Sequence, residues 1–166
     1  GANPKIGDCR GSAPLHIVAA SNRNLNGMQL LIEHGADPNQ RDSRGRTPFH
    51  ELISSFHYDK PAQIEYAKPI IKFFLDNGAD PECRDNDGVT PMALGPHRFG
   101  PEIFGLLVSK CKSDSAKKEC WFGLSREGDI AKFTETLEGM LAAGMEIDQR
   151  DESGRTLYLH SLTHEE

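Results

Sequence analysis

Apolar residues recur at helical spacing in short stretches along the chain. Leu15, Val18 and Ala19 form one apolar face, and residues 25–32 carry the next. Positions three or four residues apart lie on the same side of a helix. Further apolar stretches of this kind lie at 49–53, 70–75, 92–94, 103–107 and 130–141. The pattern predicts an all-α protein made of short helices that follow one another in pairs.

The helical stretches are separated by a segment that repeats four times. Residues 35–50 read GADPNQRDSRGRTPFH, and residues 78–93 read GADPECRDNDGVTPMA. Residues 144–159 read GMEIDQRDESGRTLYL, and residues 1–16 read GANPKIGDCRGSAPLH. The four blocks align without a gap, and their starts are 34, 43 and 66 residues apart. A period in this range indicates stacked units that bury their apolar faces against their neighbours.

Each recurring residue has a mechanical reason to be there. Gly35 follows an apolar helix and can end it in the left-handed conformation. Thr47 is suited to cap the next helix, and Pro48 suits its first position. The same three residue types recur 43 positions later. The glycines that we expect in tight turns are Gly45, Gly88 and Gly154.

This recurring motif resembles the ankyrin repeat. The resemblance depends on Asp42, Gly45, Thr47, Pro48 and His50, preceded by Gly35, Ala36 and Asp37, and on their equivalents from Gly78 to Pro91. It implies a solenoid of stacked helix-turn-helix units with projecting β-turn loops. It also implies that His16 and His50 bond to neighbouring backbone and tie the repeats together. Repeats in which Met92, Ala93 or Leu157 replaces a motif residue are expected to be less regular.

The predicted organisation is one ankyrin-repeat domain over residues 1–166. The repeats are expected at 8–41, 42–84 with an insertion near 56–64, 85–118, a degenerate 119–150 and a partial 151–166. The surplus of the second repeat has two open interpretations: a lengthened first helix with a loop, or a projecting contact loop that presents Phe56 and Tyr58. Both ends fall inside a repeat, so we expect this chain to be a piece of a longer array.

Charge and composition narrow the function. A formal net charge of −6 disfavours nucleic acid as the general partner. No apolar run reaches the roughly 18 residues of a membrane span. The four cysteines lack metal-finger spacing, so we interpret them as reduced thiols of an intracellular protein, cytoplasmic or nuclear. A disulfide between Cys111 and Cys120 is the alternative.

The turns between helix pairs, here called tips, carry the variable charge. Tip 2 (42–46), together with Arg41 directly before it, is basic, and tip 3 (85–89) is acidic. The aspartates of the motif, Asp42, Asp85 and Asp151, are expected to be structural, which leaves the variable residues as contacts. The predicted contacts with a partner, on tips and first helices, are Arg41, Arg44, Arg46, Asn22, Glu51, Ser55, Phe56, Tyr58, Asp87, His97 and Arg155.

The resemblance implies a protein–protein interaction module, regulatory or scaffolding, that binds through a concave groove and the tips. We expect it to be monomeric as an isolated segment, without catalytic residues, metal or cofactor. A second hypothesis is an enzyme or small-ligand binder that uses the irregular regions 56–61 and 95–128. A third is a structural array that holds other domains apart. The residues that a metal or acid–base site would use are His50 and His57, with Asp59 or His97.

Overall fold

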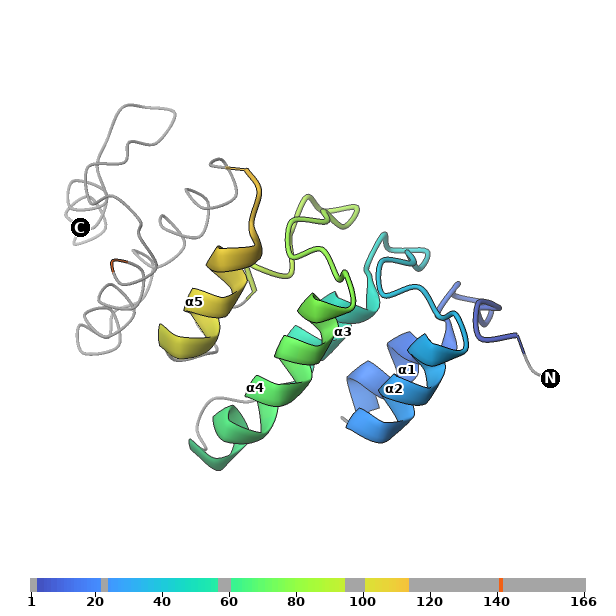
Figure 1. The fold of residues 1–166 in the computed structure, drawn as a ribbon. Coiled ribbons are helices and arrows are strands. Elements are labelled where there is room, and N and C mark those ends of the chain that lie inside the picture. The colour runs from blue at the N-terminus through green and yellow to red at the C-terminus, as the bar shows by residue number, and fades with distance from the viewer. Residues whose placement is uncertain (1–2, 22–23, 57–60, 95–100, 114–140, 142–166) are drawn as a thin grey trace. The chain divides into compact units, whose positions relative to one another are not determined.

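The computed structural model describes residues 3–21, 24–56, 61–94, 101–113 and 141 (Figure 1). The chain divides into two compact units, Gly1–Leu94 and Gly95–Glu166. All regular elements in the described ranges are helices, and these ranges contain no strand. The predicted all-α class is therefore confirmed for this part of the chain.

The first unit contains two helix pairs. Helices α1 (Pro14–Ser21) and α2 (Leu25–Glu33) form the first pair, and α3 (Pro48–Ser55) and α4 (Pro61–Asp76) form the second. Helices α1 and α3 lie side by side, and α2 packs against α1. The turns that join successive pairs lie together at one end of the helices (Figure 1). In the second unit the structure describes α5 (Pro101–Lys110), which begins at the proline that the sequence predicts.

The helix boundaries follow from the recurring residues. The Oγ1 of Thr47 accepts a hydrogen bond from the backbone N–H of His50, and Pro48 occupies the first turn of α3. After α2, Gly35 has a φ of +90°. A side chain with a β-carbon is strained in this region, and glycine is not. The predicted cap and the predicted helix end are both confirmed.

A core of aliphatic and aromatic side chains holds the second helix pair together. Phe49 of α3 and Phe74 of α4 stack with ring centroids 5.9 Å apart and an interplanar angle of 17°. Both rings are fully buried. A stacked aromatic pair contributes about 0.5–1.5 kcal/mol beyond its burial. The other buried apolar residues of this pair are Leu52, Ile53, Phe56, Ala67, Ile70, Ile71 and Leu75.

The surplus of the second repeat lies mainly in its second helix. Helix α3 has 8 residues, as α1 has, whereas α4 has 16 and α2 has 9. The interpretation as a lengthened first helix is therefore wrong. Helix α4 continues through Pro69, which has no N–H to donate to the carbonyl of Glu65. Because Glu65 and Pro69 are both exposed, water can bond to that carbonyl instead.

The third repeat is less regular, as the replaced motif residues predict. Thr90 still accepts a hydrogen bond from the backbone N–H of Ala93 (3.0 Å). Residues 91–94 form a turn instead of a helix. The predicted degenerate repeat 119–150 and partial repeat 151–166 lie outside the described residues, apart from Leu141.

Candidate protein-binding surface

Each tip is built around one aspartate that bonds to the backbone of its own turn. In tip 2 the Oδ1 of Asp42 accepts from the backbone N–H groups of Arg44 (2.9 Å) and Arg46 (2.8 Å). In tip 3 the Oδ1 of Asp85 accepts in the same way from Asp87 (3.0 Å) and Val89 (2.9 Å). The prediction that these two aspartates are structural is confirmed. Asp151 lies outside the described residues.

Neighbouring tips are joined by backbone hydrogen bonds in a constant register. The N–H of Ser43 donates to the carbonyl of Arg10 in tip 1 (8–12), and the N–H of Asn86 donates to the carbonyl of Arg44, both at 2.9 Å. The donor residue comes one position after the aspartate of its own tip. The acceptor residue comes two positions after the aspartate of the previous tip. We call this series the tip ladder. It fixes the spacing of side chains on successive tips.

Two buried histidines connect each helix pair to the next tip. The Nδ1 of His16 accepts from the N–H of Ala13, and its Nε2 bonds to the carbonyl of Arg46 (both 3.1 Å). The Nδ1 of His50 accepts from the N–H of Thr47, so its Nε2 carries the proton that bonds to the carbonyl of Val89 (3.1 Å). Burial lowers the pKa of His50 below its ordinary value of 6.5. The predicted role of both histidines is confirmed.

Asn39 connects the second repeat to the third, a role that the sequence does not predict. Its Nδ2 donates to the carbonyl of Gly78, and its Oδ1 accepts from the N–H of Asp80, both at 2.8 Å. The other three blocks place Lys5, Glu82 and Asp148 at this position, so no recurrence marks it.

The exposed arginines of tip 2 fit the predicted contact surface. Arg41 is exposed. The side chain of Arg44 is 63% exposed, while its Nη2 lies 2.8 Å from the Oε1 of Glu51 and its Nε lies 3.5 Å from the Oδ2 of Asp42. Both acids are far less exposed than the arginine. The charge that tip 2 presents to solvent is therefore positive.

Arg46 and Ser55 have internal partners. The side chain of Arg46 is 17% exposed, donates to Ser54 and to the carbonyl of His50, and lies 3.2 Å from the Oε1 of Glu51. The hydroxyl of Ser55 donates to the carbonyl of Leu52 at 2.8 Å. Arg46 holds the base of tip 2 against α3, whereas Ser55 bonds within α3 itself. Neither side chain is free for a partner in this structure.

Phe56 also lies in the core. Its side chain is 2% exposed, directly after the end of α3. Since a buried ring offers no surface to a partner, we leave Phe56 out of the proposed surface. The sequence favours an exposed loop position for Phe56, because it does not predict that α4 starts at Pro61.

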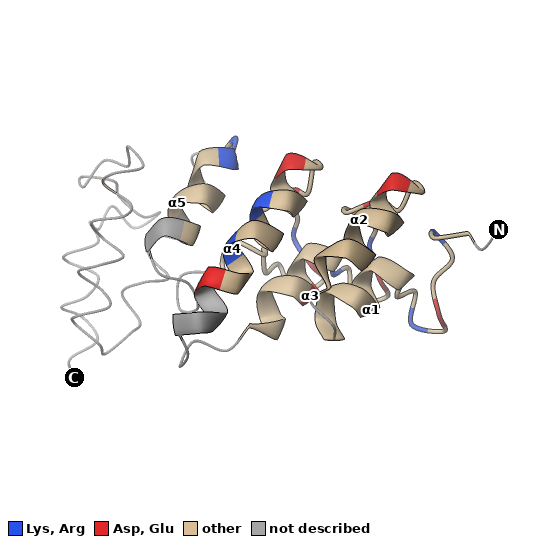
Figure 2. Cartoon of the chain, turned by 60° about the horizontal axis from the view of Figure 1, so that its bottom comes forward, with Lys and Arg blue, Asp and Glu red and all other residues tan. Residues whose placement is uncertain are grey.

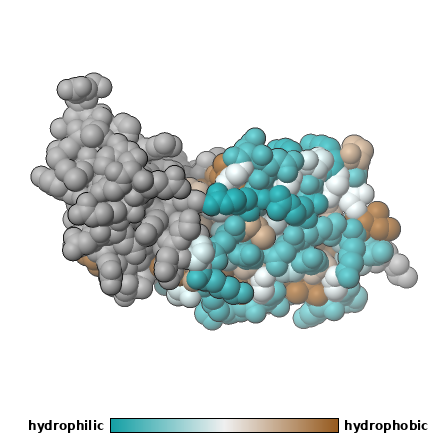
Figure 3. Space-filling view, turned by 90° about the horizontal axis from the view of Figure 1, so that it is seen from above, coloured by the Kyte–Doolittle hydropathy of each residue, from teal (hydrophilic) through white to brown (hydrophobic). Residues whose placement is uncertain are grey.

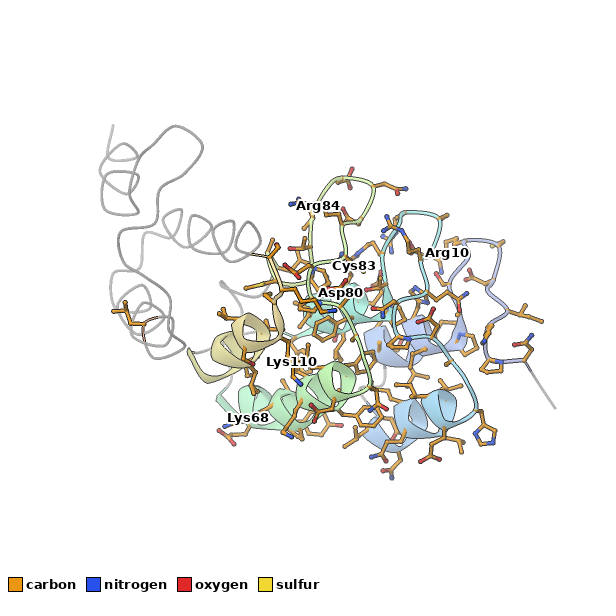
Figure 4. All side chains as sticks on the ribbon, turned by 45° about the horizontal axis from the view of Figure 1, so that its top comes forward. Arg10, Lys68, Asp80, Cys83, Arg84 and Lys110 are labelled. Carbon is orange, nitrogen blue, oxygen red and sulfur yellow. The ribbon has the colours of Figure 1, made fainter. Side chains whose placement is uncertain are left out.

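Tip 3 presents the opposite charge to solvent. Asp87 is exposed at the position that Arg44 occupies in tip 2. Arg84 donates from Nη1 to the carbonyl of Gly88 (2.9 Å) and lies toward the end of the turn, while Asp80 and Cys83 lie closer to the helices (Figure 4). Burial, followed by the nearby Asp80 carboxylate, raises the pKa of the Cys83 thiol. A raised pKa lowers the share of Cys83 that is present as the reactive thiolate.

The charges of the first unit lie mainly in its turns. Helices α1 to α3 contain two charged residues in total, Glu33 and Glu51, whereas Figure 2 shows charged residues along α4 as well. Seen from the side of the tips, the described surface is largely hydrophilic (Figure 3). A polar face on a fixed frame matches the polar rim of protein interfaces.

Four predicted contacts and most residues of the metal hypothesis fall outside the described residues. These contacts are Asn22, Tyr58, His97 and Arg155, and the metal hypothesis also needs His57 and Asp59. Within the described ranges, no three His, Cys, Asp or Glu side chains are grouped as metal ligands. Both ring nitrogens of His50 already have hydrogen-bond partners. This geometry favours the structural role for His50.

Cys9 is exposed, Cys83 is partly exposed and Cys111 is buried, and none of these three described cysteines is in a disulfide. Cys120, the other half of the alternative disulfide, lies outside the described residues. Among the helices that the structure describes, none is long and apolar enough to span a bilayer.

Comparison with known proteins supports the resemblance of the repeated motif to the ankyrin repeat. Residues 2–52 match the family model "Ankyrin repeats (many copies)". Human Rabankyrin-5 is 45% identical over 47 residues, which are 28% of this chain and 4% of that protein. The chain thus spans a small part of the relative that it matches. The third block continues the same motif, with the same bonds in its tip. Residues 2–52 are thus similar to ankyrin repeats, and the third block extends this similarity along the chain.

Proposed function

We propose that this chain is a protein–protein interaction module, with a regulatory or scaffolding role, that binds its partner through the tips and the adjoining surface of the first helices. Ankyrin repeats are generally modules of this kind. The observation that supports the proposal is the division of labour within each tip. The recurring aspartate bonds inward to the backbone, while Arg41, Arg44 and Asp87 stay exposed at variable positions.

A fixed frame favours binding of a folded or extended protein partner. The tip ladder and the histidine bonds hold the exposed side chains before the partner arrives. Binding then costs less conformational entropy than binding by a flexible loop. Arginine is also enriched among the residues that dominate interface energies. We further propose that the chain is monomeric in isolation and acts inside the cell, where its free thiols persist.

The test is affinity capture followed by mass spectrometry with wild-type protein and the double variant Arg41→Ala/Arg44→Ala. We expect one or more proteins that the wild type retains to be lost from the variant. Both arginines are exposed, so the variant is expected to fold. Retention of the same proteins in the same amounts by the double variant would contradict the proposal.

The matched control is Lys72→Ala on α4. The side chain of Lys72 is 63% exposed, as that of Arg44 is, and it too pairs with a carboxylate, Asp76, at 3.1 Å. The variant Lys72→Ala removes one exposed cation at a position away from the tips. Capture by this control must equal that of the wild type for a loss in the double variant to be assigned to tip 2.

A further inference from the structure

The first two repeats differ at one pair of equivalent positions. The gap-free alignment of residues 1–16 with 35–50 makes Arg10 the equivalent of Arg44, and continuing it into the helix makes Ile17 the equivalent of Glu51. In the second repeat these positions hold the ion pair Arg44–Glu51 at 2.8 Å. In the first repeat the arginine remains, and an isoleucine replaces the acid.

The surrounding backbone is the same in both repeats. Asp8 accepts from the N–H groups of Arg10 (2.8 Å) and Ser12 (2.9 Å), as Asp42 does from Arg44 and Arg46. These bonds to Ser12 and Arg10 lower the pKa of Asp8. The helix that follows tip 1 starts in the same register, because His16 bonds to Ala13 as His50 bonds to Thr47. Ile17 therefore stands relative to Arg10 as Glu51 stands relative to Arg44.

The substitution leaves a cation and an apolar side chain exposed together. The side chain of Arg10 is 79% exposed, and its one described carboxylate contact is Asp8 at 3.7 Å, beyond good hydrogen-bond distance. The side chain of Ile17 is 50% exposed, so it offers apolar surface to a partner. Arg10 lies next to tip 2, to which its carbonyl is bonded (Figure 4). Arginine is enriched in protein interfaces, and an exposed aliphatic side chain beside it adds apolar surface that a partner can cover.

We propose that the first repeat binds an acidic segment of the partner, with one carboxylate placed on Arg10 as Glu51 is placed on Arg44. An aliphatic side chain of the same partner segment, next to that carboxylate, covers Ile17. The ion pair in the second repeat supplies the geometry of the complex, because the same frame recurs one repeat earlier. This proposal rests on the proposed function and specifies the chemistry of its partner.

The experiment is an NMR titration of the ¹⁵N-labelled chain with a synthetic peptide that alternates glutamate and leucine. Saturable shifts are expected at the amides of Arg10, Ile17 and Ser43. The matched peptide with glutamine in place of glutamate is expected to bind about tenfold more weakly, which corresponds to about 1.4 kcal/mol. Equal binding of the two peptides, shifts centred elsewhere or the absence of saturation would overturn the proposal.

Two variants sharpen the test. Ile17→Glu places the carboxylate inside the chain, so it is expected to occupy Arg10 and to weaken binding of the glutamate–leucine peptide by about tenfold. Ile17→Leu keeps an aliphatic surface and is expected to bind as the wild type does. Wild-type affinity in Ile17→Glu would contradict the inference. Partner capture that still depends on Arg41 and Arg44, without this peptide site, would overturn this inference and leave the proposed function standing.

Discussion

Tip 2 and tip 3 have the same backbone bonds and opposite exposed charge. In each, an aspartate accepts from the N–H groups two and four positions later, and the tip bonds to its predecessor through the tip ladder. Arg44 in tip 2 and Asp87 in tip 3 occupy equivalent positions, both exposed. The frame is thus independent of the charge that it displays. The proposed function thus assigns recognition to other residues of the five-residue turn than those that hold its backbone.

The largest expected effect comes from breaking the frame itself. Asp42→Ala removes a nearly buried carboxylate that accepts two backbone bonds, so the free energy of unfolding is expected to fall by about 2–3 kcal/mol. Asp85 is less buried, so Asp85→Ala is expected to cost less. Urea denaturation measures both. A loss below about 0.5 kcal/mol for Asp42→Ala would show that the aspartate does not hold the tip.

A pH dependence is expected from the link between α3 and tip 3. Burial lowers the pKa of His50 in the folded chain, so below its ordinary value of 6.5 the unfolded chain takes up a proton more readily. Stability is therefore complete above about pH 6.5 and falls as the pH drops toward the folded-state pKa, by at most about 1.4 kcal/mol per pH unit. Urea denaturation at pH 7.5 and 5.5 tests this.

The control for this pH dependence is a second histidine. His50→Gln is expected to reduce the change in stability between the two pH values, whereas His34→Gln, at an exposed position, is expected to leave it in place. A His50→Gln variant that loses stability with falling pH as steeply as the wild type would assign the effect to other groups.

A smaller effect is expected from the bond that joins repeats two and three outside the tips. Asn39→Ala removes one donor and one acceptor, both partly exposed to water, and is expected to lower the free energy of unfolding by about 1 kcal/mol. Asn77→Ala is a matched control, since its Nδ2 bonds within its own helix end, to Phe73. Equal losses in the two variants would remove any special role of Asn39 between repeats.

The smallest change in stability is expected from the displayed charge. Asp87→Arg gives tip 3 the charge of tip 2. Asp87 takes part in the frame through its backbone N–H, which the substitution keeps, so the free energy of unfolding should stay within about 0.5 kcal/mol of the wild type. Partner capture, in contrast, is expected to change. A large loss of stability in this variant would show that frame and displayed charge are coupled.

The frame could be predicted from the sequence, and the fate of several charged residues could not. Asp42, Thr47 and His50 each bond to backbone groups of the tip or the helix start, and Gly45 takes the positive φ of +74° that the tip requires. Arg46 was predicted as a surface contact, yet Glu51 and Ser54 bind it at the base of the tip. A single sequence does not show whether an arginine will find an internal carboxylate.

Two further features depend on packing between segments. A proline such as Pro69 is normally a helix breaker, so the sequence does not indicate the length of α4; Pro69 is exposed here, where water can bond to the carbonyl that lacks its usual donor. The bonds of Asn39 require the turn before tip 3 to lie against it, which no local pattern encodes. Recurrence identifies what all repeats share, and it is silent on contacts that one repeat makes alone.

Amide hydrogen exchange at the tips tests the shared frame most directly. The N–H groups of Ser43 and Asn86 donate within the tip ladder, whereas the N–H of Cys9, at the equivalent position of tip 1, has no acceptor among the described residues. We predict clear and similar protection of Ser43 and Asn86, despite the opposite charges of their tips, and fast exchange at Cys9. Exchange at Ser43 or Asn86 as fast as at Cys9 would contradict the account.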